Sequence, residues 1–304
     1  MKKFLMIAAC AALVFATGSC KNAKKTAGTD TDAAPAELRY VGTDTCWTVA
    51  KEGVPTYTVV LKPQVDLASL HKDDEGYFIL FDGSSTAGWR GYGKDSIPSR
   101  WSIEDNCLKF TGTGTGEAQT LEGGDILFAH QFRNFELKFD WKISRGGNSG
   151  VLYLAQEITT KNEDGTVKYE PIYISAPEYQ ILDNANHPDA KLGKDGNRQS
   201  ASLYDMIPAV PQNQKPFGEW NTGAIMVYQG TVVHYQNEEK VLEYHLWTPQ
   251  WTGMLQASKF SQKAWPLAFE LLDNLGGDGH RGYIGFQDHG NDVWYRNIRV
   301  KVLD

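Results

Sequence analysis

Acidic, amide and imidazole side chains are concentrated between Glu178 and Asp189, in the sequence EYQILDNANHPD. The segment begins as a β-strand in which Glu178 and Gln180 share one face, because side chains alternate between the two faces of a strand. Asp183 and His187 follow in a loop that a proline ends. A carboxylate and an amide on a buried strand face cost free energy unless they meet a ligand or each other. The segment is therefore either one wall of a site or a polar strand face followed by a solvated turn.

Two histidines and a glutamine supply further groups for acid–base chemistry. Gln287 and His289 share one face at the end of another predicted strand, and His234 lies in a third. If these strands are neighbours, their side chains converge with Glu178 on one site. General acid–base catalysis needs groups of these types within reach of a substrate, although each imidazole could instead hold a backbone carbonyl. The candidate catalytic residues are Glu178, His234, His289 and Asp183.

Amide and aromatic side chains nearby are suited to binding a sugar. Gln180 and Gln287 are placed to orient hydroxyl groups, and Asn148, in a glycine-rich hairpin turn, is placed to contact a ligand. Trp247 and Trp251 flank a proline in a loop-like stretch. Their rings either stack on the C–H faces of a sugar or pack beneath a long loop.

The same acid and imidazole groups are of the types that bind a divalent metal ion. Glu178, His234 and His289 are the candidate ligands, with Asp183 as a further carboxylate. No short-spaced pattern such as His-Glu-x-x-His accompanies them. A divalent metal ion acting as an electrophile is therefore a candidate cofactor, and no other cofactor is indicated.

The segments that must position these residues are predicted to be strands. Residues 135–143 alternate apolar and polar side chains without a break, as in a strand with one buried face. Turn residues separate further strand predictions at 56–61, 77–81, 151–154, 179–182, 224–228, 231–235, 240–245, 282–287 and 293–302. We therefore expect residues 77–304 to form an all-β, two-sheet antiparallel sandwich of jelly-roll type. Residues 37–76 are expected to be an N-terminal extension packed on it.

The N-terminus is predicted to be a lipoprotein signal peptide. Residues 1–19 combine a basic start, an apolar run too short to span a bilayer and small residues directly before Cys20. Cys20 would be the lipidated first residue of the mature chain and residues 20–36 a flexible tether, unless an ordinary secretory signal is cut nearby. Lysines directly after Cys20 favour the periplasmic side of the membrane over the cell surface.

Charge and cysteine content narrow the partners and the compartment. The formal net charge is −7, which argues against a nucleic-acid partner. Outside the first 20 residues, only Cys46 and Cys107 remain. In an oxidising compartment this pair forms either a disulfide or two buried thiols.

An ordered set of short segments resembles the 3-keto-disaccharide hydrolase domain family. The segments are LFDGS at 80–84, GW at 88–89, FELKFD at 135–140, GNSG at 147–150, EYQILDN at 178–184, LYDM at 203–206, GEWN at 218–221, HYQN at 234–237, KF at 259–260, GFQDHG at 285–290 and YRNI at 295–298. The resemblance covers about residues 77–303 and implies a concanavalin A-like jelly roll of the lectin and glucanase type. Tyr235 and the turn at 237–239 depart from the family pattern, which bears on substrate choice.

The activity that this resemblance implies is cleavage of glycosides whose sugar carries a ketone at C3. The ketone acidifies the hydrogen on C2, so a base can form an enolate, and the C1 aglycone can then leave by elimination. Water adds back later, which gives net hydrolysis. The route needs a base near C2, a positive or hydrogen-bonding group near O3 and an acid near the glycosidic oxygen. An oligosaccharide or glycoside is thus the expected partner.

Two other functions remain open at this point. One is a conventional retaining β-glycosidase, because Glu178, Gln180 and Asp183 loosely resemble the catalytic strand of laminarinase-like enzymes. Such an enzyme needs two carboxyl groups about 5–5.5 Å apart. The other is a carbohydrate-binding module without activity, since jelly rolls host both binding and catalysis.

Overall fold

The computed structural model describes residues 37–114 and 122–304. The predicted signal peptide (1–19) and tether (20–36), with Cys20, lie outside the described residues. No helix in the described part of the chain is long and apolar enough to cross a membrane. Strands dominate, and every strand pairing is antiparallel.

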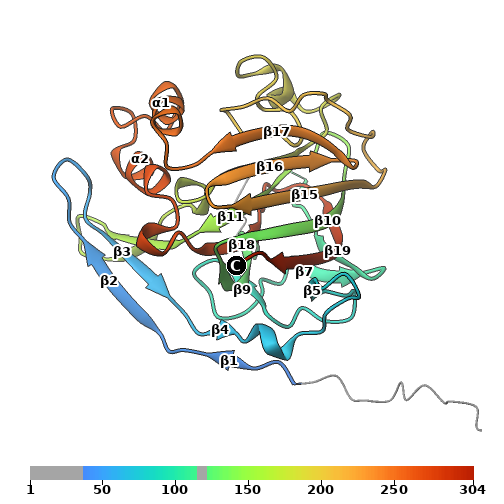
Figure 1. The fold of residues 1–304 in the computed structure, drawn as a ribbon, viewed down its shortest axis with the longest axis horizontal. Coiled ribbons are helices and arrows are strands. Elements are labelled where there is room, and N and C mark those ends of the chain that lie inside the picture. Colours follow the sequence, from blue (N-terminus) through green and yellow to red (C-terminus); the bar gives the residue numbers. More distant parts are fainter. Residues whose placement is uncertain (1–36, 115–121) are drawn as a thin grey trace, which may run out of the picture. The chain divides into compact units, whose positions relative to one another are not determined.

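The larger of the two main sheets, here called the large sheet, has eight strands (Figure 1). In spatial order they are β17 (Glu239–His245), β16 (Thr231–Gln236), β15 (Asn221–Tyr228), β10 (Phe135–Ile143), β19 (Val293–Val302), β8 (Cys107–Phe110) and β7 (Trp101–Glu104), with β5 (Phe78–Phe81) also paired to β19. The unbroken alternation in β10 buries every second side chain, because one face of this sheet covers the core.

The second main sheet, here called the small sheet, packs against the first. Its strands are β14 (Glu178–Leu182), β11 (Asn148–Ala155), β18 (Gly282–Phe286), β9 (Ile126–Phe132) and β6 (Trp89–Gly91). Across the core, Tyr179 of the small sheet meets Phe139 of the large sheet edge to face, with ring centroids 5.4 Å apart. The predicted two-sheet antiparallel jelly-roll sandwich is confirmed.

The outer face of the small sheet, turned away from the core, is divided into an apolar and a polar part. A second apolar cluster covers one part and comprises Leu127, Leu152, Ala155, Ile172, Ala176 and Tyr283. Since Tyr179 and Ile181 belong to the main core, the alternate residues Glu178 and Gln180 point to the outer face. They lie in the part that the apolar cluster leaves free.

Residues 37–76 add strands beside the sandwich. β1 (Tyr40–Val41) pairs with β4 (Gln64–Val65), while β2 (Thr45–Val49) and β3 (Tyr57–Leu61) form a hairpin. β3 also pairs with β12 (Glu157–Lys161), which pairs with β13 (Val167–Tyr169). The extension thus shares a sheet with the chain segment that directly follows β11.

Helices are few and short. The α-helices are α1 (Pro249–Ala257) and α2 (Pro266–Asp273), and the 3-10 helices are η1 (Leu67–Ser69), η2 (Ile172–Ile174), η3 (Pro188–Lys191) and η4 (Gly277–Gly279). Thr248 caps α1 by accepting a hydrogen bond from the backbone N–H of Trp251, as serine and threonine do at helix N-termini.

The two cysteines of the described residues are not bonded to each other. Cys46 lies exposed in β2 and Cys107 is buried at the start of β8. For this pair, neither predicted alternative, a disulfide or two buried thiols, is therefore found. Burial raises the pKa of the Cys107 thiol, as expected when the charged form loses water.

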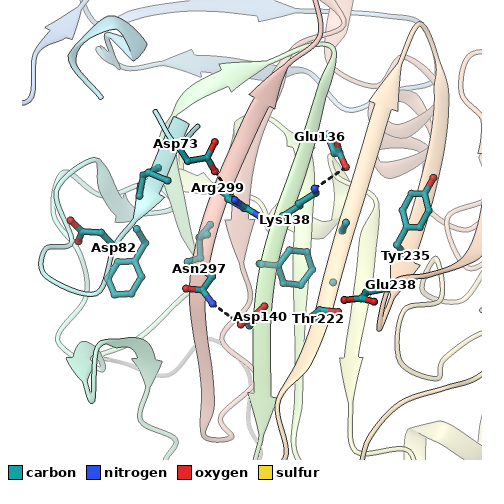
Figure 2. A pocket seen from close by; sticks show the side chains of 16 residues that line it. Asp73, Asp82, Glu136, Lys138, Asp140, Thr222, Tyr235, Glu238, Asn297 and Arg299 are labelled. Atoms are coloured by element: carbon teal, nitrogen blue, oxygen red, sulfur yellow. Dashed lines mark hydrogen bonds and ion pairs between the residues drawn. The ribbon is translucent and has the colours of Figure 1, made fainter. Parts of the chain in front are cut away.

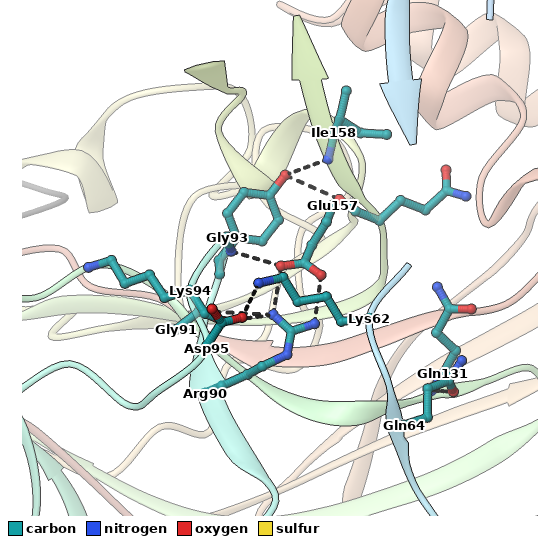
Figure 3. A network of polar contacts seen from close by, with 12 residues as sticks. Lys62, Gln64, Arg90, Gly91, Gly93, Lys94, Asp95, Gln131, Glu157 and Ile158 are labelled. Carbon is teal, nitrogen blue, oxygen red and sulfur yellow. Dashed lines mark hydrogen bonds and ion pairs between the residues drawn. The ribbon is translucent and has the colours of Figure 1, made fainter. Parts of the chain in front are cut away.

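A buried ion pair joins the small sheet to β12 (Figure 3). The Arg90 guanidinium donates two hydrogen bonds to Glu157, of 2.7 Å to Oε1 and 2.6 Å to Oε2. The backbone N–H of Gly93 donates a third, of 2.8 Å. The side chain of Glu157 has 0% exposure and that of Arg90 has 8%. Removal of either partner would leave a buried charge without compensation.

We predict that Arg90→Met lowers the free energy of unfolding by about 3–5 kcal/mol, because Glu157 is left buried and charged. The double variant Arg90→Met/Glu157→Leu should recover most of the loss. Urea unfolding curves measure both. Lys240→Met, which removes the exposed pair between Lys240 and Glu243, is the control and should leave the stability nearly unchanged, because water screens exposed pairs. A single Arg90 variant as stable as this control would contradict the prediction.

Candidate active site

A pocket of about 230 Å³ opens on the polar part of the small sheet's outer face. Glu178 and Gln180 from β14 and Asn148 from β11 form its floor, and Gln287 and His289 follow directly after β18. β14 pairs with β11, and β11 pairs with β18. Three adjacent strands therefore bring these groups together. The complete lining is Asn148, Tyr173, Glu178, Gln180, Tyr204, Lys259, Gln287 and His289.

The absence of a side chain at Gly150 makes room for Glu178. Gly150 lies opposite Gln180 in the β11–β14 ladder. A Cβ atom at Gly150 would lie 2.3 Å from Glu178 Oε1, which is closer than van der Waals contact allows. The carboxyl group therefore lies against the backbone of β11 and is held beside the other floor residues.

Burial sets the protonation of Glu178. Its residue exposure is 8%, and its pKa is raised to about 8, chiefly because burial removes water from the charged form. The charges of Asp125 and Asp189 raise the pKa further, while Lys259 and a hydrogen bond from Gln287 lower it. The carboxyl group can therefore take up or release a proton near neutral pH.

The pocket also contains polar atoms that have no protein partner. Eight buried side-chain nitrogen and oxygen atoms of the described residues lack a hydrogen bond, and four of them belong to pocket residues. These four are Asn148 Oδ1, Gln180 Nε2, Gln287 Oε1 and His289 Nδ1. Unpaired buried polar atoms are costly and rare in folded proteins. A ligand whose groups both donate and accept hydrogen bonds, such as a sugar hydroxyl, would satisfy them.

One wall of the pocket is formed by residues that are not among the predicted site residues. Lys259 Nζ lies 4.5 Å from the ring centroid of Tyr204 and 5.7 Å from that of Tyr173. The Tyr204 hydroxyl donates a 2.9 Å hydrogen bond to Asp189, which also accepts one of 2.9 Å from Arg198. These residues come from long connections between strands, where no residue alternation indicates direction. Of these residues, Tyr204 and Lys259 lie in the family-like segments at 203–206 and 259–260, and Asp189 ends the segment EYQILDNANHPD.

The structure does not bring His234 into this pocket. Its ring lies in the core between the sheets, with an exposure of 0%. Nδ1 donates to the backbone oxygen of Ala201 at 2.9 Å, and Nε2 accepts from the Tyr153 hydroxyl at 2.8 Å. Burial lowers its pKa to about 4, so it is neutral at pH 7. The predicted convergence of His234 with Glu178 is therefore wrong.

Asp183 is buried at a turn and supports the loop. Its carboxylate accepts hydrogen bonds from the backbone of Gly146 (2.7 Å) and Ala185 (3.2 Å) and from the side chain of Asn186 (2.7 Å). It does not line the pocket. Its contacts account for its burial without a ligand.

Both candidate tryptophans pack within the protein. Trp251, in α1, has an exposure of 1%, and its indole N–H donates to the backbone oxygen of Leu272 at 2.9 Å. Trp247 stacks on His280, with ring centroids 3.7 Å apart, and its N–H donates to Leu275. Trp251 reaches only a cavity of about 20 Å³ beside Glu178. The alternative of packing beneath a long connection is thus the one observed.

The predicted metal ligands are not assembled. His234 points into the core, away from Glu178 and His289, as described above. In residues 37–114 and 122–304, no three His, Cys, Asp or Glu side chains are grouped to hold a metal ion.

A larger hollow, of about 770 Å³, lies on the outer face of the large sheet (Figure 2). Several of its polar groups have partners within the protein: Arg299 donates to Asp73 at 2.6 Å, and Asn297 donates to Asp140 at 2.7 Å. No buried polar atom without a partner belongs to its lining. The smaller pocket around Glu178 is therefore the better candidate for chemistry, although it is not the largest hollow.

The fold is an antiparallel jelly-roll sandwich, and it holds a buried carboxyl group in a pocket lined by polar side chains, as is typical of the carbohydrate-active class of proteins. Residues 76–301 match the family model of the 3-keto-alpha-glucoside-1,2-lyase-like domain, and the chain belongs to this family. It is accordingly an enzyme, of the glycoside-cleaving hydrolases.

Two known proteins support this assignment. The chain is 68% identical over 256 residues to a 3-keto-disaccharide hydrolase of Bacteroides thetaiotaomicron, a match that covers 84% of this chain and 88% of that protein. A crystal structure of a candidate glycosyl hydrolase from Parabacteroides distasonis is similar with a TM-score of 0.59 at 27% identity. That match covers 76% of this chain and 95% of the solved one. The resemblance predicted from the sequence is confirmed.

We predict that Glu178→Gln stabilises the protein, and more so at high pH. The unfolded carboxyl group ionises near pH 4.5, whereas the folded one keeps its proton to about pH 8. Between these values the unfolded state binds fewer protons, so the stability of the wild type falls as pH rises. The glutamine variant lacks this loss and should be more stable by at least about 1 kcal/mol at pH 9.

Urea unfolding at pH 5 and pH 9 measures the difference. Glu219→Gln is the matched control, because Glu219 is exposed and its replacement should change stability by less than about 0.5 kcal/mol at either pH. A Glu178→Gln variant whose stability relative to wild type does not rise with pH would contradict the burial of an ionisable carboxyl group.

Proposed function

We propose that the protein cleaves 3-keto-glycosides or 3-keto-disaccharides by removal of the C2 proton, elimination of the C1 aglycone and later addition of water. One observation carries this proposal: the buried carboxyl group of Glu178, with its pKa raised to about 8, lies among four unpaired polar atoms. A carbon acid needs a stronger base than an ordinary carboxylate, and the ideal base titrates near the working pH. The name of the Bacteroides relative supports the substrate class.

The other pocket residues meet the remaining requirements of the route. Lys259 supplies a positive group, which an enolate oxygen at C3 requires. Asn148, Gln180 and Gln287 have free donor or acceptor atoms for the sugar hydroxyls. His289, half-buried at the rim, is suited to protonate the leaving oxygen.

The pocket does not favour a conventional retaining glycosidase. Glu178 is the single carboxyl group among its eight lining residues. The retaining route needs a second carboxyl group about 5–5.5 Å away, and Asp183 is engaged in backbone contacts. Elimination needs one base, which this pocket has.

The decisive assay compares a β-glucoside with its 3-keto form, using the protein with and without EDTA. We expect cleavage of the keto form alone, and solvent deuterium incorporated at C2 of the product. Glu178→Gln should lower kcat/KM by about 10²–10⁴-fold, because general base catalysis contributes that much. In the wild type, kcat/KM should rise about tenfold per pH unit and level off near pH 8, where Glu178 is ionised.

Three results would separate the alternatives. Cleavage of the unoxidised glucoside would reject the proposal in favour of a conventional glycosidase, and binding without turnover would favour a sugar-binding module. Glu219→Gln is again the matched control and should leave kcat/KM unchanged.

Loss of activity in EDTA would indicate that the enzyme needs a divalent metal ion as a cofactor.

We also propose that the enzyme is a lipoprotein anchored through Cys20, on the periplasmic side of the membrane. The apolar run and the small residues before Cys20 support this. Radioactive palmitate should label the wild type and not Cys20→Ala, which should move to the soluble fraction. Cys46→Ala, at an exposed cysteine, is the control and should stay labelled. Equal labelling of both variants would reject the proposal.

A further inference from the structure

Lys259 occupies the same pocket as Glu178 and carries a nitrogen nucleophile. The pocket lining contains no other amine. Its Nζ lies over the rings of Tyr204 and Phe260, 4.5 and 5.0 Å from their centroids. Within the described residues, no carboxylate lies within 4.0 Å of this nitrogen and no hydrogen bond engages it. By contrast, Lys109 and Lys240 each have a carboxylate oxygen within 3 Å.

We infer that the Lys259 amine forms a covalent iminium bond with C3 of the keto sugar, and that this bond, rather than electrostatic stabilisation of an enolate oxygen, activates the C2 proton. The inference rests on the proposed function, because it needs a ketone at C3. The inference gives a nucleophilic role to Lys259, which is not among the predicted site residues but lines the pocket in the structure.

The surroundings of Lys259 suit an amine nucleophile. Removal of water lowers the pKa of the ammonium group, although the charge of Glu178 opposes this shift. A lower pKa increases the fraction of neutral amine, which is the form that attacks a carbonyl. Although the residue as a whole is exposed, its amine lies over the rings of Tyr204 and Phe260 and lines the pocket. These rings shield the amine from water, while the pocket gives a substrate carbonyl access to it.

The reaction balances in atoms and electrons without an oxidant or reductant. The neutral amine adds to C3, one water leaves and the imine nitrogen keeps one proton taken from the pocket, which gives an iminium ion; the final hydrolysis returns this proton. Glu178 takes the C2 proton, and the electron pair of that bond forms an enamine. The enamine electrons expel the C1 oxygen, and the leaving oxygen takes a proton from the pocket, which His289 can supply. A second water adds at C1 while C2 regains a proton, and a third water hydrolyses the iminium ion. The net consumption is one water.

Iminium formation also explains why one base is sufficient. A protonated imine withdraws electrons from C2 more strongly than a ketone does, so the C2 proton becomes more acidic. Lysine forms such Schiff bases with carbonyl substrates when its neutral form is accessible. The carboxyl group of Glu178, with which Lys259 interacts electrostatically, then has to move a single proton.

Reductive trapping tests the bond directly. The full-length protein is incubated with methyl 3-keto-glucoside and sodium cyanoborohydride, which reduces iminium ions in preference to ketones, and is then analysed by peptide mass spectrometry. We expect a sugar adduct on Lys259 in the wild type. Glu178→Gln should also form it, because imine formation precedes proton removal. The exposed lysines Lys191 and Lys194 are internal controls and should stay unmodified.

Exchange of the carbonyl oxygen provides a second readout. Iminium formation and hydrolysis replace the C3 oxygen with solvent oxygen, so Glu178→Gln in ¹⁸O water should accelerate exchange above the spontaneous rate. Lys259→Arg keeps the positive charge but cannot form the imine. It should abolish the adduct and the accelerated exchange, and lower kcat/KM by more than about 10²-fold.

The outcomes separate this inference from the proposed function. If the wild type cleaves the keto substrate but gives no adduct, and Lys259→Arg keeps activity within about tenfold, the iminium is rejected and Lys259 acts by charge alone. If the wild type cleaves no keto substrate at all, the proposed function fails. Circular dichroism verifies that each variant is folded, and Lys259→Met is the second variant should the arginine not fit.

Discussion

The exclusion of water from the Glu178 carboxyl group is the constraint on which the site depends. It arises from the backbone of β11, because Gly150 leaves the space into which the carboxyl group fits. The apolar cluster on the same sheet face and the tyrosine wall complete the enclosure. The same burial that raises the pKa of Glu178 also removes water from the amide groups around it. Burial of Glu178 therefore lowers the free energy of unfolding and at the same time gives a base that titrates near neutral pH. Active sites commonly combine these two effects.

The sandwich and several residues of the pocket could be predicted from the sequence, because the alternation of side chains along a strand is a local property. In β14 the spacing of Glu178 and Gln180 places both on one face whatever the rest of the chain does. Gln287 and His289 follow from the same rule at the end of β18. The antiparallel ladders then bring β14, β11 and β18 side by side. The register, which the sequence does not determine, converts two separate polar faces into one pocket.

The position of His234 could not be predicted from strand alternation. Alternation tells which residues of β16 share a face, but it does not tell which face meets the core. His234 shares its face with Val232, and both are fully buried. A histidine can lie there because Tyr153 and Ala201 satisfy both ring nitrogens, and these partners are distant in the sequence. The tryptophans and Lys259 raise the same difficulty, since packing between distant segments decides where their side chains lie.

Glu178 and Lys259 line one pocket, and the charge of each influences the protonation of the other. Burial raises the pKa of the acid and lowers that of the amine, which brings the two values toward each other. The charged pair and the neutral pair then become closer in free energy than they would be in water. A bound sugar would displace more water and add to both shifts, so substrate binding itself favours the neutral amine. If the amine became the cationic imine proposed above, its positive charge would lower the pKa of Glu178, as that of Lys259 does, and would favour the ionised carboxylate. Each of the two groups would thus prepare the other for its step.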